Sequence, residues 1–222
     1  MKEVSAMDVN DVENDAEQAA GPSDWFEPLY AQAAGDADRV PWALPGATPY
    51  LADWLSQNQV NGEGRSAVVV GCGLGDDAEA LAAAGFEVTA FDVSASAIAW
   101  AKQRFPQSKV TYAIADLFNF PAAWRGAFDL VFDFRTIQAL PLAVRQAVIG
   151  QIAALGASDG TVLIATYLRE DGAPAGENPP WPLTLEELSY FEAVGLSVVK
   201  QQRFQKAESR FCDRILIQYR VP

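Results

Sequence analysis

The sequence predicts an α/β fold with a doubly wound, mostly parallel sheet that ends in an antiparallel hairpin. Apolar runs alternate with helix-like segments between residues 66 and 167, which is the pattern of parallel strands covered by helices on both faces. Two further strand-like runs, residues 196–204 and 214–219, follow each other with no helix between them. A parallel pair needs a long crossover, so these two strands should pair antiparallel.

The strands of the parallel part are predicted from continuous apolar runs that turn residues bound on each side. A strand that is apolar on both faces belongs in a parallel sheet whose two faces are covered. The runs are residues 66–71, 87–92, 109–116, 128–133 and 161–167.

The helices are predicted from their start and stop residues. Gly85 suits the left-handed position after a helix end, Ser94 is placed as a side-chain cap, and Pro141 suits a first helical turn. Thr184 and Glu187 have the spacing of a capping box. The predicted helices are residues 50–55, 76–84, 95–105, 141–154 and 185–194.

The 222 residues suit one domain that follows a short tail. We expect residues 1–22 to form a disordered acidic tail, because residues 1–20 contain six acidic side chains, one lysine and few side chains that can be buried. Residues 23–222 form the domain, in which residues 23–60 form an aromatic cap. That cap is too apolar for a linker and too rich in proline for one continuous helix.

The composition excludes several classes of function. The net charge is −13, from 16 basic and 29 acidic residues, which disfavours nucleic acid and anionic membranes as partners. There is no histidine, so Ser-His-Asp catalysis, Cys-His catalysis and histidine-ligated metals are excluded. Two cysteines make neither a disulfide framework nor a cysteine-only zinc site. With no signal-peptide-like or bilayer-spanning run, we expect a cytoplasmic protein that uses no metal.

The most informative stretch is the glycine loop, residues 71–75, between a buried strand and a helix. Gly71, Gly73 and Gly75 allow a tight turn and let a ligand lie against the backbone. A dinucleotide fingerprint needs a glycine where Asp76 stands, and a carboxylate at a helix start is a poor neighbour for a pyrophosphate. The loop therefore suits a ligand whose adjacent end is positive.

Two acidic residues end the next two strands at the same edge of the sheet. Asp92 lies roughly 20 residues beyond the glycine loop, where a carboxylate can accept hydrogen bonds from both ribose hydroxyls. Asp116 is placed to accept a hydrogen bond from an adenine amino group. Either residue alone has another explanation, Asp92 as an acid at a helix start and Asp116 as a turn residue. Their joint spacing favours a nucleoside site.

With these residues, the chain resembles the class I S-adenosylmethionine-dependent methyltransferases. The glycine loop, Asp92 and residues 115–118 carry the resemblance, and the terminal hairpin matches that family's seven-stranded sheet with one reversed strand. The resemblance implies a Rossmann-like methyltransferase fold and S-adenosyl-L-methionine as the cofactor. Short motifs are more narrowly similar to the thiopurine, thiol and halide methyltransferase subgroup, at residues 41–42, 128–145 and 179–188.

By position, the resemblance assigns the cofactor contacts. The methionine part would lie on the glycine loop, the ribose on Asp92, and the adenine beside the residues that follow the second and third strands. Trp42 and Trp25 would close over the cofactor. The cofactor-binding residues that the resemblance implies are Gly71, Cys72, Gly73, Gly75, Asp92, Val93, Asp116, Leu117, Phe134, Trp42 and Trp25.

Asp133 and Arg135 end the fourth strand in a pattern that departs from the family's, and they are the candidate catalytic residues. Arg135 would attract an anionic acceptor, and Asp133 is one of few proton acceptors in a chain without histidine. Arg135, Trp181 and Tyr30 are expected at the acceptor, in a pocket that residues 170–183 complete. Arg135 is as readily explained by a surface ion pair, and Trp181 by core packing.

The predicted function is methyl transfer to a small-molecule acceptor. A thiol or another soft nucleophile is favoured, because it is partly ionised near neutrality and needs no strong base. Cys72 is not expected to act as a nucleophile, since neighbouring acids should raise the pKa of its thiol. A non-catalytic cofactor-binding module and a dinucleotide-dependent oxidoreductase are the alternatives. The sequence leaves the acceptor and the oligomeric state open.

Overall fold

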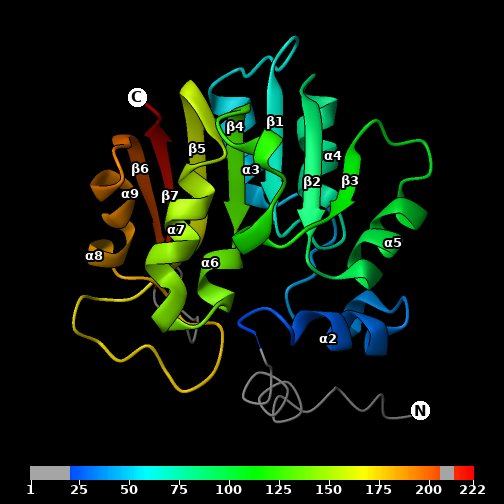
Figure 1. The fold of residues 1–222 in the computed structure, drawn as a ribbon, viewed down its shortest axis with the longest axis horizontal. Helices are drawn as coiled ribbons and strands as arrows, with labels where there is room; N and C mark the ends of the chain where they lie inside the picture. Colours follow the sequence, from blue (N-terminus) through cyan, green and yellow to red (C-terminus); the bar gives the residue numbers. More distant parts are fainter. Residues whose placement is uncertain (1–20, 206–212) are drawn as a thin grey trace.

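The computed structural model describes residues 21–205 and 213–222, so most of the predicted acidic tail and Cys212 lie outside the described residues. The described chain forms a seven-stranded sheet with helices on both faces (Figure 1). In chain order the strands are β1 (Ser66–Val70), β2 (Glu87–Asp92), β3 (Thr111–Ile114), β4 (Phe128–Phe134), β5 (Gly156–Leu168), β6 (Ser197–Gln205) and β7 (Asp213–Arg220).

The strands lie in the order β3-β2-β1-β4-β5-β7-β6. Those from β3 to β5 pair in parallel, whereas β7 is antiparallel to both β5 and β6. The strand order reverses at β1, which lies between β2 and β4, and the carboxyl ends of β2 and β4 point to the lower edge of Figure 1. The predicted α/β fold, a doubly wound sheet with an antiparallel hairpin, is confirmed.

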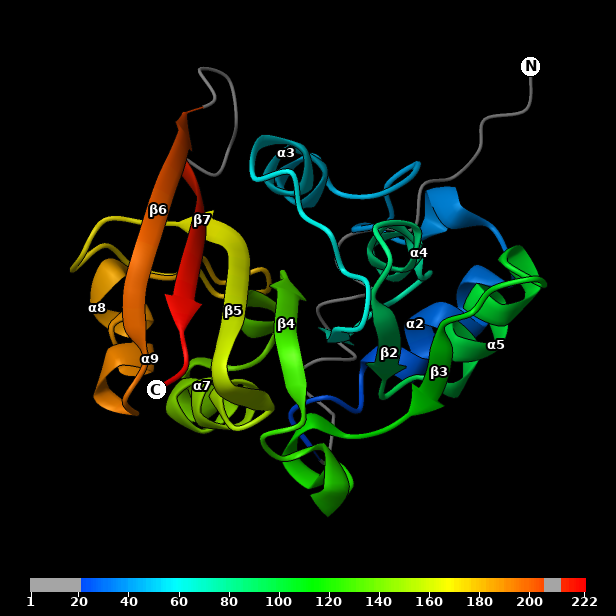
Figure 2. The same cartoon turned by 90° about the horizontal axis from the view of Figure 1, so that it is seen from above.

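Helices and 3₁₀ turns connect the strands, and Figure 2 shows α3 and α4 on one side of the sheet and α7 on the other. They are α2 (Phe26–Ala33), η1 (Ala37–Arg39), α3 (Pro49–Gln57), α4 (Asp76–Ala83), α5 (Ala95–Arg104), η2 (Leu117–Asn119), η3 (Ala122–Trp124), α6 (Thr136–Ala139), η4 (Leu142–Val144), α7 (Arg145–Ala153), α8 (Leu185–Leu188) and α9 (Tyr190–Ala193).

The core has two layers because successive side chains of a strand point to opposite faces of the sheet. Val68 of β1 belongs to the cluster that contains Ile149 of α7. The next residue, Val69, belongs to the cluster that contains Leu81 of α4. All four side chains are buried. The continuous apolar run of β1 is therefore needed to fill both layers.

The cap contains a helix that the sequence analysis did not predict. Pro28 lies in the first turn of α2, where its missing N–H has no partner within the helix in any case. The prolines that follow lie beyond the helix end at Ala33. The cap is therefore not one continuous helix, as the sequence predicts, although residues 26–33 form a short helix that it did not predict.

Two predicted helices are also divided in the structure. Pro141 precedes the 3₁₀ turn η4, so α7 begins only at Arg145. The helix predicted over residues 185–194 is split at Ser189, whose hydroxyl donates a 2.7 Å hydrogen bond to the carbonyl oxygen of Glu186. A hydroxyl that bonds back to a carbonyl of the preceding turn bends a helix.

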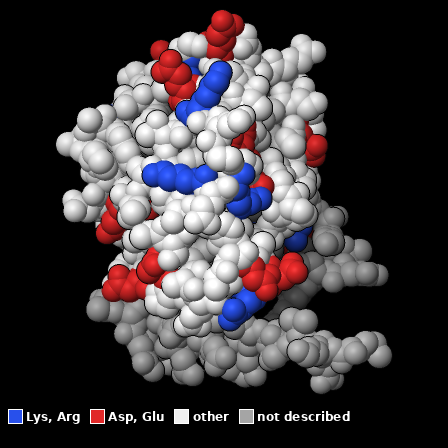
Figure 3. Space-filling view, turned by 90° about the vertical axis from the view of Figure 1, so that its right-hand side faces the viewer, with Lys and Arg blue, Asp and Glu red and all other residues white. Residues whose placement is uncertain are grey.

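One face of the described surface mixes charges of both signs (Figure 3). On the face shown in Figure 3, which is the β3 and α5 side, Lys and Arg side chains are interspersed with Asp and Glu side chains. The overall charge of −13 therefore does not form a single-sign patch on that face. No helix in the described part of the chain is long and apolar enough to cross a membrane.

A carboxylate joins the cap to the body. Both oxygens of Glu27, in the first turn of α2, accept hydrogen bonds at the start of α5: from the Ser94 hydroxyl at 2.6 Å, the Ser96 hydroxyl at 2.6 Å and the Ser96 backbone N–H at 3.0 Å. The serine hydroxyls and the positive end of α5 stabilise the charged form of Glu27, and its pKa is lowered although burial opposes this. This contact holds α2 on α5.

Removing this contact should destabilise the protein. We expect Glu27→Ala to lower the free energy of unfolding by about 1–2 kcal/mol, the size of a few partly exposed hydrogen bonds to a charged group. Urea denaturation followed by tryptophan fluorescence measures the change. Glu63→Ala is the matched control, because Glu63 is exposed. Equal stability of the two variants would contradict a role of Glu27 in holding the cap.

Candidate active site

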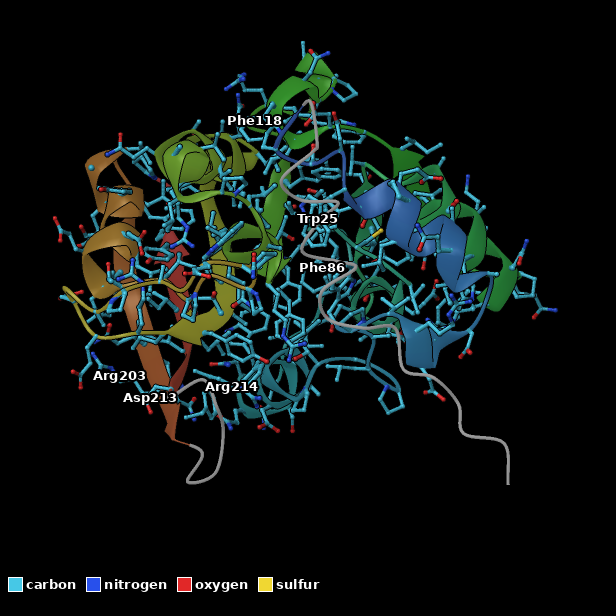
Figure 4. The ribbon with its side chains drawn as sticks, turned by 90° about the horizontal axis from the view of Figure 1, so that it is seen from below. Trp25, Phe86, Phe118, Arg203, Asp213 and Arg214 are labelled. Atoms are coloured by element: carbon cyan, nitrogen blue, oxygen red, sulfur yellow. The ribbon has the colours of Figure 1, made fainter. Side chains whose placement is uncertain are left out.

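A cavity of about 420 Å³ opens at the carboxyl edge of the sheet, next to the cap. The glycine loop after β1, the residues after β2, β3 and β4, and the aromatic residues of the cap all line it. Figure 4 looks onto this edge, and Trp25 lies near the centre of that view. Strand ends on both sides of β1 thus enclose one ligand-sized space, where open α/β sheets bind ligands.

The glycine loop adopts left-handed backbone that other residues rarely adopt. Gly71 has φ 57° and Gly73 has φ 50°. A Cβ atom on Gly71 would lie 2.5 Å from Oγ1 of Thr136, and one on Gly73 would lie 2.8 Å from the hydroxyl oxygen of Tyr30. Glycine is therefore required here both by the backbone conformation and by close neighbours, and a ligand can approach the main chain at these positions.

Asp92, at the end of β2, is buried on the cavity wall and is held by backbone donors. Its Oδ2 accepts a 2.9 Å hydrogen bond from the N–H of Gly73, and its Oδ1 accepts a 3.0 Å hydrogen bond from the N–H of Ser94. Burial raises the pKa of Asp92, and these hydrogen bonds oppose the increase. A carboxylate can accept about four hydrogen bonds, so capacity for two ribose hydroxyls is left.

The residues after β3 form the other end of the cavity. Asp116 accepts a 2.9 Å hydrogen bond from the N–H of Phe118 and so caps the turn η2. Leu117 is buried on the cavity wall, and Val93 lines the cavity from the end of β2. Apolar walls beside one carboxylate suit a flat base that carries an amino group.

The aromatic residues of the cap pack against one another beside the cavity. The indole N–H of Trp42 donates a 2.7 Å hydrogen bond to the hydroxyl of Tyr30. Trp25 packs edge-on against Trp42 with ring centroids 5.6 Å apart. Tyr30 is buried, which raises the pKa of its hydroxyl well above the usual value. Trp25, Tyr30 and Trp42 all line the cavity, so the cap supplies an aromatic wall.

Cationic and aromatic groups meet at the cavity wall after β4. Arg135 has φ 71°, and its guanidinium lies 4.3 Å from the ring centroid of Phe134 and 5.2 Å from that of Tyr167. The guanidinium of Arg214 lies 5.1 Å from the same Tyr167 ring. Burial, and then the positive charge of Arg214, lower the pKa of Arg135. Arg135 makes no ion pair within the described residues, so the explanation as a surface ion pair does not apply there.

Two of the expected acceptor-side residues do not line the cavity. Asp133 is fully buried inside the sheet, and neither of its oxygens has a hydrogen-bond partner among the described residues. Trp181 lies in the loop after β5, where its backbone N–H donates a 2.7 Å hydrogen bond to the backbone carbonyl of Gln138. From this loop, Pro179 and Pro180 line the cavity instead of Trp181.

Cys72 lines the cavity as a wall residue. Burial, with a further contribution from Asp92, raises the pKa of its thiol well above the usual value. A thiol in that state is a poor nucleophile. The expectation that Cys72 is unreactive is therefore supported, with burial as the larger cause.

The cavity also contains residues that the sequence analysis did not name as site residues. Two residues that bring a carboxyl or hydroxyl group to the wall are Asp77, in the first turn of α4, and Tyr167, near the end of β5; Ser23, Asp76 and Thr136 do so as well. Asp77 and Tyr167 both had a signal in the sequence. Asp77 directly follows the glycine loop, and Tyr167 ends a strand whose carboxyl end reaches the same edge.

Comparison with known proteins identifies the family. The thiopurine S-methyltransferase family matches residues 32–213. The chain is similar to a probable thiol methyltransferase 2 of Arabidopsis thaliana, with 31% identity over 115 residues, which cover 50% of this chain and 49% of that protein. It is also similar to a ubiquinone biosynthesis O-methyltransferase of Aromatoleum aromaticum, with 34% identity over 95 residues, 42% of this chain and 40% of that protein. The chain thus spans less than half the length of these two curated relatives.

Solved structures agree on the fold. The N-methyltransferase NodS of Bradyrhizobium japonicum, in complex with S-adenosyl-L-homocysteine, has a TM-score of 0.68 and 22% identity, and the match covers 89% of this chain and 98% of that one. The resemblance found in the sequence, and S-adenosyl-L-methionine as the cofactor that it implies, are confirmed by the family match. The protein belongs to the thiopurine S-methyltransferase family, a family of S-adenosylmethionine-dependent methyltransferases.

Proposed function

We propose that the protein transfers the methyl group of S-adenosyl-L-methionine to a small-molecule acceptor that is a thiol or another soft nucleophile. One observation carries the proposal: a single cavity joins the glycine loop, Asp92 and Asp116 to the cationic wall around Arg135. The first group suits an adenosyl cofactor, and the second suits an anionic acceptor. The similarity to a thiol methyltransferase supports the same acceptor class.

The residues present fit the cofactor. A Cβ atom on Gly73 would close the approach to the main chain, and Asp92 keeps acceptor capacity on the wall. We propose that the ribose lies on Asp92 and the base against Asp116 and Leu117, with the cap tryptophans over the cofactor. A tryptophan face stabilises a cation by roughly 0.5–2 kcal/mol, which favours a sulfonium. The bound cofactor supplies an activated methyl group.

The chain's own residues then have to align the acceptor and exclude water. Well-oriented reactants gain about 7–11 kcal/mol from proximity. No histidine is present to take a proton, so an acceptor that is already partly ionised is favoured. A thiol with a pKa of about 8.5 meets that requirement, and the charge of Arg135 would lower that pKa further. A cytoplasmic, reducing setting would keep such a thiol free.

A turnover assay tests the proposed function. The protein is incubated with methyl-labelled S-adenosyl-L-methionine and, separately, small thiols, halides, metalloid oxyanions, phenols and amines. We expect S-adenosyl-L-homocysteine and a labelled thioether with at least one thiol. Tight cofactor binding without turnover of any acceptor would instead favour a non-catalytic binding module. Saturable binding of a reduced dinucleotide without binding of S-adenosyl-L-methionine would favour an oxidoreductase.

Replacing Arg135 tests whether this residue acts on the acceptor and not on the cofactor. We expect Arg135→Ala to lower kcat/KM for an anionic thiol about tenfold or more, the loss of a charge-assisted contact, and to leave the cofactor Kd within about twofold. Steady-state kinetics and calorimetry measure the two quantities. Arg203→Ala is the control, because Arg203 is exposed on β6. Loss of cofactor binding in Arg135→Ala would place Arg135 at the cofactor instead.

A further inference from the structure

Asp77 is a half-buried carboxylate on the cavity wall that the proposed function leaves unused. It lies in the first turn of α4, two residues beyond Gly75, and lines the same cavity as the glycine loop and Arg135. Its Oδ1 accepts a 2.7 Å hydrogen bond from the backbone N–H of Thr48. That bond holds the carboxylate in place from the segment that precedes α3.

The negative charge of Asp77 is not neutralised by a neighbouring cation. The adjacent carboxylate, Asp76, is paired with Arg104 through both of its oxygens. Asp77 makes no such pair among the described residues, and Arg135 is near enough to lower its pKa but lies beyond ion-pair distance. Burial is the larger effect and raises the pKa of Asp77 to about 7.

A buried carboxylate without a cation is unfavourable, and a ligand that brings a cation removes that cost. Asp77 follows the glycine loop, on which the methionine part of the cofactor is proposed to lie, and lines the same cavity wall. The methionine end of the cofactor carries two cationic groups, the sulfonium and the α-ammonium. Only the ammonium has N–H groups to donate, and Oδ2 of Asp77 has no hydrogen-bond donor among the described residues.

We propose that Asp77 binds the α-ammonium group of the cofactor's methionine part through a charge-assisted hydrogen bond. Asp77 is then a determinant of which adenosyl compounds the cavity accepts. S-adenosyl-L-methionine and S-adenosyl-L-homocysteine both keep the α-ammonium, whereas 5′-methylthioadenosine keeps the nucleoside and the sulfur but has no amino acid part. The proposal rests on the cofactor site described above.

The test compares these three ligands by calorimetry on the full chain. We expect Asp77→Asn to raise the Kd for S-adenosyl-L-methionine and for S-adenosyl-L-homocysteine by the same factor, about tenfold or more. The Kd for 5′-methylthioadenosine should stay within about twofold of the wild-type value. Retained binding of 5′-methylthioadenosine also shows that the variant is folded. Asp53→Asn, the same change on the exposed surface of α3, is the control and should bind all three ligands as the wild type does.

Each other outcome overturns the proposal. If the variant binds all three ligands more weakly by the same factor, Asp77 maintains the shape of the cavity. If only the binding of S-adenosyl-L-methionine is weakened, Asp77 interacts with the sulfonium. Unchanged binding with lost turnover would assign it to the acceptor. If the wild type binds none of the three, the proposed cofactor site itself fails, which is a distinguishable result.

A second measurement begins with the wild type alone and is then repeated on Asp77→Asn. An S-adenosyl-L-homocysteine analogue that lacks the α-amino group should bind the wild type about tenfold more weakly than S-adenosyl-L-homocysteine. In Asp77→Asn the difference between these two ligands should fall to within about twofold, since the interaction has already been removed. Equal affinity of the wild type for both ligands would overturn the proposal whether or not the variant folds.

Discussion

Asp133→Asn should make the protein more stable above neutral pH, by about 2–4 kcal/mol. The carboxyl group of Asp133 is fully buried and makes no well-formed hydrogen bond among the described residues, although polar groups of Thr136 and Ile137 lie near enough to oppose part of the effect of burial on its pKa. Burial raises its pKa to about 7, against about 3.9 in an unfolded chain. At any pH between these two pKa values, Asp133 is therefore protonated in the native state but ionised in the unfolded state.

The sign of the pH dependence follows from that proton. The contribution of Asp133 to stability is fully present below about pH 4, decreases as the pH rises, and is lost above about pH 7. An asparagine does not ionise, so the advantage of the variant should be near zero at pH 4 and largest at pH 8. Urea denaturation at a series of pH values measures it.

Asp171→Asn, a change at an exposed loop position, is the control and should show no such trend. An advantage that is constant with pH would contradict the ionisation argument. The same variant bears on catalysis. Asp133 does not line the cavity, so only a loss of turnover in Asp133→Asn beside its gain in stability would support the expected role as proton acceptor.

Asp92→Ala should weaken the binding of S-adenosyl-L-methionine by about 10–100-fold, because the change removes charge-assisted contacts worth about 1.5–3 kcal/mol. The carboxylate also anchors the N–H groups of Gly73 and Ser94, so its loss loosens the glycine loop as well. Calorimetry on the wild type and variant measures the change. Glu87→Ala, at the exposed start of the same strand, is the control and should bind the cofactor normally. Unchanged affinity in Asp92→Ala would mean that the ribose lies elsewhere.

The positions of Asp92 and Asp116 could be predicted because both depend on local chain geometry. Asp92 ends β2 and Asp116 follows the end of β3, both strands are recognisable from their apolar runs, and parallel strands bring their carboxyl ends to one edge. The glycine loop was predictable for the same reason. The helix break at Ser189 could not be predicted, because it depends on a hydrogen bond from one side-chain hydroxyl to a backbone carbonyl of the preceding turn.

The acceptor side depends on contacts between distant segments. Arg135 takes its place from the rings of Phe134 and Tyr167 and from a left-handed backbone conformation that the residue type does not indicate. Asp133, one residue before Phe134, is fully buried and does not line the cavity. The sequence could name both residues but not say which of them lines the cavity.

By itself, then, the sequence determined the succession of strands along the chain, the glycine loop and the carboxylates that end or follow the strands, since periodicity and turn residues are local properties of the chain. Only the tertiary structure decided that Asp77 belongs to the cavity without a cation beside it, that Asp133 is enclosed, and that Arg135 faces the cavity beside Arg214. The reason is physical: burial and electrostatic environment are set by neighbours that lie far away in the chain and meet only when the sheet has formed.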